Sequence, residues 1–139
     1  MKKGIDQRSP CPVSITLDIM GDKWSLLIIR DMMFYNKNTY GDFLKSPEQI
    51  ATNILSDRLI QLEKAGIIVV EKYPDNKIKK FYKLSQKGID LMPIILEIAV
   101  WGDKYFEIPE YPKTLAKETK KDRDGLVKHL STKLKKVKQ

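Results

Sequence analysis

Four polar side chains within residues 52–58 are the strongest candidates for specific hydrogen bonding: Thr52, Asn53, Ser56 and Arg58. The Asn53 amide can form two hydrogen bonds with the edge of an adenine, a contact that discriminates against other bases by about 1–3 kcal/mol. The Arg58 guanidinium can reach a phosphate or pair with a nearby carboxylate. Such groups are suited to reading a DNA major groove. The alternative is a simpler role for each residue, in which Thr52 does no more than cap a helix and Asn53 and Ser56 are merely solvated.

The apolar residues of the same segment predict the helix that would present these side chains. Leu55, Leu59 and Leu62 recur at helical spacing, which buries one face and leaves most of the polar candidates on the other. Gly66 tolerates the left-handed conformation that commonly ends a helix. The predicted recognition helix therefore covers about residues 52–65.

A basic β-hairpin, or wing, is predicted directly after this helix, over about residues 67–84. Residues 67–70 are β-branched and suit a strand, and the residues at 74–77 suit a turn. Five lysines lie on the hairpin: Lys72, Lys77, Lys79, Lys80 and Lys83. Because strand side chains alternate between two faces, not all five can touch the same DNA, and we favour Lys77 and Lys79. A solvated basic edge that prevents aggregation is the alternative.

The residues before position 52 predict a buried central helix and the first helix of a helix-turn-helix. Pro12 suits the first position of a helix, which places Cys11 at its N-cap. Residues 23–34 are apolar nearly all round and should form the central helix. Thr39 can cap a short helix, and a turn joins that helix to the predicted recognition helix.

The C-terminal third contains more apolar surface than one small domain needs for its core. Pro93 should kink or restart a helix, and almost every residue from 94 to 101 is apolar. This helix needs a second partner surface. The candidates for that interface are Ile94, Ile95, Ile98 and Trp101.

We divide the chain into a flexible N-terminus over residues 1–10, a domain over 11–106 and a basic extension over 107–139. The extension is predicted to be an amphipathic helix, with a partly disordered tail as the alternative. Its regular apolar stripe favours a role in a dimer interface. It could also lie on DNA phosphates or simply keep the chain soluble.

The chain is strongly basic, with a net charge of +8 over 139 residues. This charge favours a phosphate backbone or an anionic membrane as partner, although a merely soluble basic protein is also possible. The apolar runs are far shorter than a membrane span, and no apolar signal segment follows the N-terminal lysines. We therefore expect a cytoplasmic protein with no membrane contact.

Cys11, the single cysteine, is the remaining functional candidate. A thiol at a helix N-terminus can be more reactive toward oxidants and electrophiles, which makes Cys11 a possible redox sensor, whereas a packing role is the alternative. The sequence has no Ser/His/Asp or Cys/His set, no glycine-rich phosphate loop and no metal spacing around Cys11 or His129. We expect no enzymatic activity, no metal and no cofactor.

A set of spaced positions over about residues 9–105 is specific as a group. It comprises Cys11-Pro12-Val13, Gly21-Asp22-Lys23-Trp24, Leu26 to Asp31, Tyr40, Ile50, Leu55, Arg58-Leu59, Leu62-Glu63, Gly66-Ile67-Ile68, Tyr73-Pro74, Tyr82, Leu84-Ser85, Gly88, Leu91, Pro93 and Trp101-Gly102. These positions resemble the HxlR-type, MarR-like winged-helix transcription regulators. The resemblance implies a mainly α fold with a small β-hairpin, that is, a winged helix-turn-helix with N- and C-terminal dimerisation helices.

The same resemblance implies that the protein is a homodimer that binds double-stranded DNA. The C-terminal helix would pack with an N-terminal helix carrying Ile15 across a twofold axis, so the operator would be pseudo-palindromic. Some relatives use the cysteine that matches Cys11 as a sensor. Two positions depart from the family: the wing tip lacks its usual prolines, and Thr39 replaces a basic residue, whose phosphate contact is either missing or supplied by Lys37.

The sequence leaves two functional classes. The first is a sequence-specific transcription regulator, and the second is a winged-helix module that binds protein partners. Specific DNA binding should depend steeply on salt and fail on shuffled sequence, which separates the two. The sequence identifies no small-molecule effector.

Overall fold

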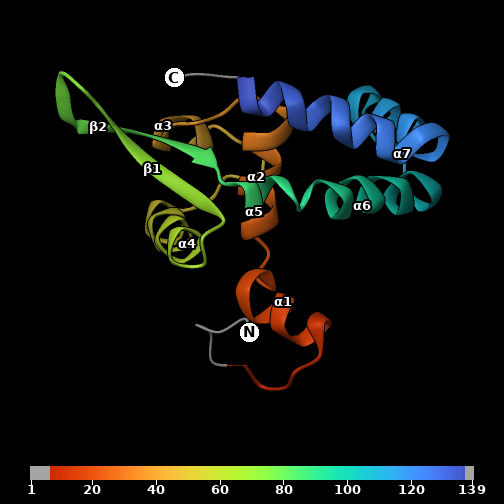
Figure 1. Cartoon of the computed structure of the whole chain (residues 1–139), viewed down its shortest axis with the longest axis horizontal. Coiled ribbons are helices and arrows are strands. Elements are labelled where there is room, and N and C mark those ends of the chain that lie inside the picture. The colour runs from red at the N-terminus through yellow and green to blue at the C-terminus, as the bar shows by residue number, and fades with distance from the viewer. Residues whose placement is uncertain (1–6, 137–139) are drawn as a thin grey trace.

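The computed structural model describes residues 7–136, except the side chain of Lys77, and arranges helices around a two-stranded hairpin (Figure 1). The elements in chain order are α1 (Pro12–Met20), α2 (Ser25–Phe34), α3 (Tyr40–Leu44), α4 (Thr52–Lys64), β1 (Ile68–Tyr73), β2 (Asn76–Leu84), α5 (Gln86–Ile89), α6 (Met92–Tyr105) and α7 (Glu110–Lys136). This is the predicted winged helix-turn-helix.

A proline and short-range hydrogen bonds mark where the first helices begin. Cys11 is the N-cap of α1 and Pro12 its first residue, as predicted. The Asp22 carboxylate accepts hydrogen bonds from the backbone N–H groups of Trp24 and Ser25, both at 2.9 Å, at the start of α2. Thr39 and Asp42 form a reciprocal capping box at α3. Short-range chemistry therefore sets these boundaries.

The predicted recognition helix corresponds to α4, and its end also follows the prediction. Gly66 adopts a positive φ of 76°, which is strained for other residues, and the N–H of Ile67 donates to the carbonyl of Leu62 at 3.0 Å. Ala51, not Thr52, is the N-cap of α4, and no side chain caps it. The open question of whether Thr52 serves as a cap is thereby answered: its hydroxyl does not.

The wing is an antiparallel hairpin with a two-residue turn. Its register pairs Ile68 with Leu84 and Lys72 with Lys80, and an irregularity follows at Lys72–Tyr73. The N–H of Tyr82 donates to the carbonyl of Asn38 at 2.7 Å. The hairpin is thereby attached to the loop that precedes α3.

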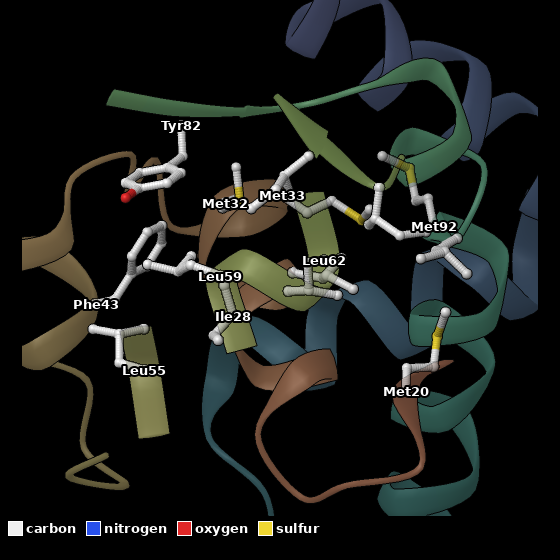
Figure 2. Packing of buried hydrophobic residues seen from close by; sticks show 14 of the residues in the cluster. Met20, Ile28, Met32, Met33, Phe43, Leu55, Leu59, Leu62, Tyr82 and Met92 are labelled. Carbon is white, nitrogen blue, oxygen red and sulfur yellow. The ribbon is translucent and has the colours of Figure 1, made fainter. Parts of the chain in front are cut away.

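The core lies where α2, α4 and α6 meet below the wing (Figure 2). The three leucines of α4 are at most 3% exposed, so the predicted apolar face of this helix is buried. α2 is the buried central helix, with Ile29 fully inaccessible. Phe43 of α3 and Tyr82 of β2 meet edge-on at 6.0 Å between ring centroids, which joins the helix-turn-helix to the wing.

The last two helices lie beside one another, and the C-terminal end of α7 comes back to the base of the wing (Figure 1). Pro93 stands at the start of α6, so the helix restarts there. The apolar stripe of α7 packs on the core of its own chain through Leu115, Leu126, Val127, Leu130 and Leu134. Inside α7, Asp122 leaves the helical conformation and accepts a hydrogen bond from the Gly125 N–H at 3.1 Å.

The N-terminal segment is partly described. Residues 1–6 lie outside the described part of the chain, as does Val137 beyond α7. The Arg8 guanidinium donates to the Asp18 carboxylate at 2.6 Å, which holds the residues before α1 against that helix. Between residues 7 and 136, no helix has both the length and the hydrophobicity to cross a lipid bilayer.

Candidate nucleic-acid interface

The N-terminal half of α4 presents the predicted polar side chains to solvent. Thr52, Asn53 and Ser56 are exposed, and Leu55 on the opposite face is fully buried. Ile60 is 50% exposed one turn further along. The structure therefore places the three candidates together on one accessible helical surface.

Tyr40 connects α3 to this surface. Its hydroxyl donates to the carbonyl of Thr52 at 3.0 Å and lies 3.2 Å from the hydroxyl of Ser56. The first hydrogen bond joins α3 to the backbone at the start of α4. The contact with Ser56 positions its hydroxyl on the exposed face of α4. The sequence identifies Tyr40 only as part of the family pattern, and its position ten residues before Ile50 is the available signal.

Arg58 is engaged with carboxylates. One guanidinium nitrogen lies 2.8 Å from Asp57 and another 3.2 Å from Asp22, and the hydrogen bond to Asp57 is the main reason that the pKa of Arg58 is raised. Burial tends to raise the pKa of Asp22, but hydrogen bonds from Ser25 and Trp24 and the charge of Arg58 lower it below its ordinary value. The sequence left two roles open for Arg58, a phosphate contact or a carboxylate pair. The structure shows the carboxylate pair.

A groove of about 570 Å³ separates α4 from the wing. It is lined by Tyr40, Ser56, Leu59, Ile60, Glu63, Val70, Lys72, Ile78, Lys80 and Tyr82. Lys72 and Lys80 are cross-strand partners and share this face. Both lysines therefore line the groove on the side of the wing that faces α4.

Of the two lysines favoured near the wing tip, Lys79 lies on the face of the wing opposite the groove. The Lys79 ammonium stacks over the Tyr73 ring at 5.0 Å from its centroid, on the face of Phe81. Lys83 pairs with Glu71 at 2.5 Å. The side chain of Lys77 lies outside the described residues. Lys80 shares its face with Tyr82, and alternation along the strand could not tell which face borders α4.

A polar network holds the turn of the helix-turn-helix against α2. The Asp31 side chain is buried and accepts a hydrogen bond from the Ser46 hydroxyl. Arg30 binds Glu48 at 2.7 Å, which lowers the pKa of that carboxyl and raises the pKa of Arg30. The Lys37 ammonium donates to the Ser46 hydroxyl at 3.0 Å, so Lys37 takes part in this network.

Exposed apolar side chains also lie on α1 and on α6. They include Val13 at 65% and Leu17 at 53% on α1, and Ile94 at 43%, Ile98 at 50% and Trp101 at 59% on α6. Of the other two predicted interface residues, Ile15 is half-buried and Ile95 packs against the core. An open hollow of about 470 Å³ runs along Pro93, Ile94, Glu97, Ile98, Trp101 and Arg123.

Cys11 is exposed, and its N–H donates to the Ser9 hydroxyl at 3.2 Å. Within the part of the chain that the structure describes, no three His, Cys, Asp or Glu side chains gather closely enough to bind a metal ion.

A helix-turn-helix with an exposed polar helix and a lysine-lined wing defines a winged-helix transcription regulator. The family model described as HxlR-like helix-turn-helix matches residues 19–110. The chain belongs to this family, whose members are transcription regulators and not enzymes, as predicted.

Individual relatives agree with this assignment. The chain is 36% identical over 108 residues to the HTH-type transcriptional regulator YdeP of Bacillus subtilis (strain 168), covering 75% of this chain and 84% of YdeP. The structure of PA1607 is 38% identical, with a TM-score of 0.65, covering 74% of this chain and 70% of PA1607. The redox regulator HypR in its oxidized form is 31% identical, with a TM-score of 0.62, covering 70% of this chain and all of HypR.

Proposed function

We propose that this regulator binds a pseudo-palindromic operator as a homodimer, with α4 in the major groove and the wing on the adjacent backbone or minor groove. The observation that carries the proposal is the exposed N-terminal face of α4 beside a groove with paired lysines. Base edges are read by hydrogen bonds in the major groove, and ammonium groups bind the phosphates that flank it. We also propose that the protein is cytoplasmic, because that is the compartment in which it would meet its operator DNA.

In this proposal Thr52, Asn53 and Ser56 contact bases, and the wing contacts phosphates. Lys72 and Lys80 would contact the strand nearest α4, and Lys77 and Lys79 would act further out on the wing. Arg58 was predicted to contact DNA directly. The ion pairs of Arg58 with Asp22 and Asp57 favour a structural role instead, in which Arg58 holds α4 against the α1–α2 junction.

The homodimer part rests on the exposed apolar side chains of α1 and α6. An apolar surface of this kind on a small soluble domain usually marks an interface. A twofold axis would place two α4 helices about 34–36 Å apart, one turn of duplex, and thereby produce a dyad-symmetric operator.

Footprinting on the DNA flanking the protein's own gene, followed by gel shifts over a salt series, tests this function. Specific binding should weaken steeply with salt and fail on shuffled sequence. Asn53→Ala should reduce discrimination at one base pair of each half-site by about 1–3 kcal/mol, or roughly 5- to 150-fold. Gln61→Ala, on the exposed side of α4 further from its N-terminus, is the matched control. Equal affinity for operator and shuffled DNA would contradict the proposal.

We further propose that oxidants or electrophiles modulate DNA binding through Cys11. The exposed thiol at the N-cap of α1 supports this, as does the likeness to a redox regulator. With one cysteine in the chain, a disulfide at Cys11 can form only with a second chain or with a small thiol. Diamide or a quinone should weaken operator binding by wild type and leave Cys11→Ser unaffected. An equal response of both proteins would eliminate Cys11 as the sensor.

A further inference from the structure

The second half of α7 carries positive charge that no acidic residue offsets. From position 125 to 136 the sequence contains four lysines and no aspartate or glutamate. We name these lysines the α7 basic end: Lys128, Lys133, Lys135 and Lys136. All four are exposed, and none is ion-paired with another described residue.

The packing of α7 fixes the direction in which this charge points. Leu126, Val127, Leu130 and Leu134 hold the second half of the helix on the core, so the lysines between them must face outward. The first half differs, because it contains acidic residues and its Lys113 pairs with Asp103 of α6 at 3.5 Å. The second half therefore presents lysines with no acidic residue among them, whereas the lysines of the first half are interspersed with carboxylates.

The α7 basic end borders the side of the molecule that carries the helix-turn-helix. In Figure 1 the last turns of α7 run back toward α3 and the wing. Lys135 and Leu134 line a cavity of about 280 Å³ together with Asn38, Tyr82 and Lys83. This cavity lies between the C-terminal end of α7, the loop before α3 and the base of the wing.

A short path leads from this cavity to the recognition helix. Asn38 immediately precedes Thr39, the N-cap of α3, and Tyr40 follows and binds the carbonyl of Thr52. The carbonyl of Asn38 also accepts the N–H of Tyr82 in β2. The α7 basic end thus lies across this cavity from the loop and the strand that support both parts of the surface that would face DNA.

We propose that the α7 basic end contacts the phosphates of the duplex that flanks each half-site. This inference rests on the proposed DNA-binding function and extends it to a surface outside the family match, which ends at residue 110. Duplex DNA is the partner that fits, because the lysines adjoin the proposed wing and because phosphate contacts require charge without side-chain geometry specific to a base.

The test is the salt dependence of operator binding by K133Q/K135Q/K136Q. Each phosphate neutralised by a lysine adds about 0.9 to the slope of log K against log salt concentration. The variant should have a shallower slope by about 0.9 for each phosphate that it no longer neutralises, and at most by about 2.7. K117Q/K120Q/K121Q, in the first half of α7, removes the same charge and should change the slope by less than about 0.9.

Two duplexes sharpen this measurement, one trimmed to the footprint and one extended by a helical turn, about 10 base pairs, on each side. Wild type should bind the extended duplex more tightly, and K133Q/K135Q/K136Q should bind both duplexes equally. Circular dichroism and thermal unfolding establish that both variants are folded, which glutamine on an exposed helical face favours.

Equal slopes for the variant and its control, with specific binding by wild type intact, would overturn this inference and leave the proposed function standing. Loss of binding to anionic phosphatidylserine vesicles in K133Q/K135Q/K136Q, with an unchanged slope on DNA, would also overturn it. Failure of wild type to distinguish operator from shuffled DNA would instead refute the proposed function.

Discussion

Asp22 makes three interactions that join the start of α2 to α4. Its replacement separates stabilisation by hydrogen bonds from stabilisation by an ion pair. Its carboxylate caps α2, accepts the hydroxyl of Ser25 at 2.6 Å and pairs with Arg58 at 3.2 Å. Asp22→Ala removes all three interactions. Asp22→Asn keeps one oxygen that can accept the backbone N–H groups at the start of α2, and its amide N–H can donate to the Ser25 hydroxyl, but it removes the charge.

The magnitudes follow from the burial of each partner. Removal of the cap costs about 0.5–2 kcal/mol, and the fully buried Ser25 hydroxyl left without its acceptor costs a further 1–3 kcal/mol or so. The ion pair is partly exposed, so its contribution is at most about 1 kcal/mol. Asp22→Ala should therefore lower the free energy of unfolding by roughly 1.5–6 kcal/mol, and Asp22→Asn by no more than about 1 kcal/mol.

Urea unfolding followed by circular dichroism measures both values, with Asp57→Ala as the control that touches only the exposed side of Arg58. Equal destabilisation by Asp22→Ala and Asp22→Asn would refute the reasoning, since the ion pair would then outweigh the cap. The pKa of Asp22 is lowered in the folded protein. Its stabilising contribution is therefore present above the unfolded pKa of about 3.9, and it disappears as the pH falls through the lower folded value.

Two further predictions concern the wing and the apolar surface. Lys72→Gln and Lys80→Gln should each reduce the salt slope of operator binding by about 0.9, whereas Lys79→Gln, on the opposite face, should reduce it less. A larger effect of Lys79→Gln would place the DNA on the face of Phe81. Ile98→Glu should shift the protein from dimer to monomer in sedimentation analysis, because a carboxylate would replace a half-exposed apolar side chain, and Ile78→Glu on the wing should not. A dimer that survives Ile98→Glu would argue against the α6 surface.

Local chemistry in the sequence was sufficient for the order and boundaries of the elements. The caps at Cys11, Asp22 and Thr39, the glycine at position 66 and the leucine spacing of α4 all act within a few residues. The sequence could therefore specify a helix with exposed polar residues followed by a basic hairpin, and the many spaced family positions identified the winged helix-turn-helix.

Only the tertiary structure decided how these parts face one another. It placed Lys80, and not Lys79, beside α4, and it used Arg58 and Lys37 in interactions with Asp22 and Ser46. Such interactions join residues distant in the sequence, and alternation or charge alone leaves two orientations equally acceptable.

The surface on which α7 packs was also decided only by the tertiary structure. Its apolar stripe was expected to extend a dimer interface, but it packs on its own chain and turns the lysines of its second half outward. An amphipathic pattern determines that one face must be buried. Which surface buries it depends on the shape and the exposed apolar area of the rest of the fold, and these exist only once the chain is folded.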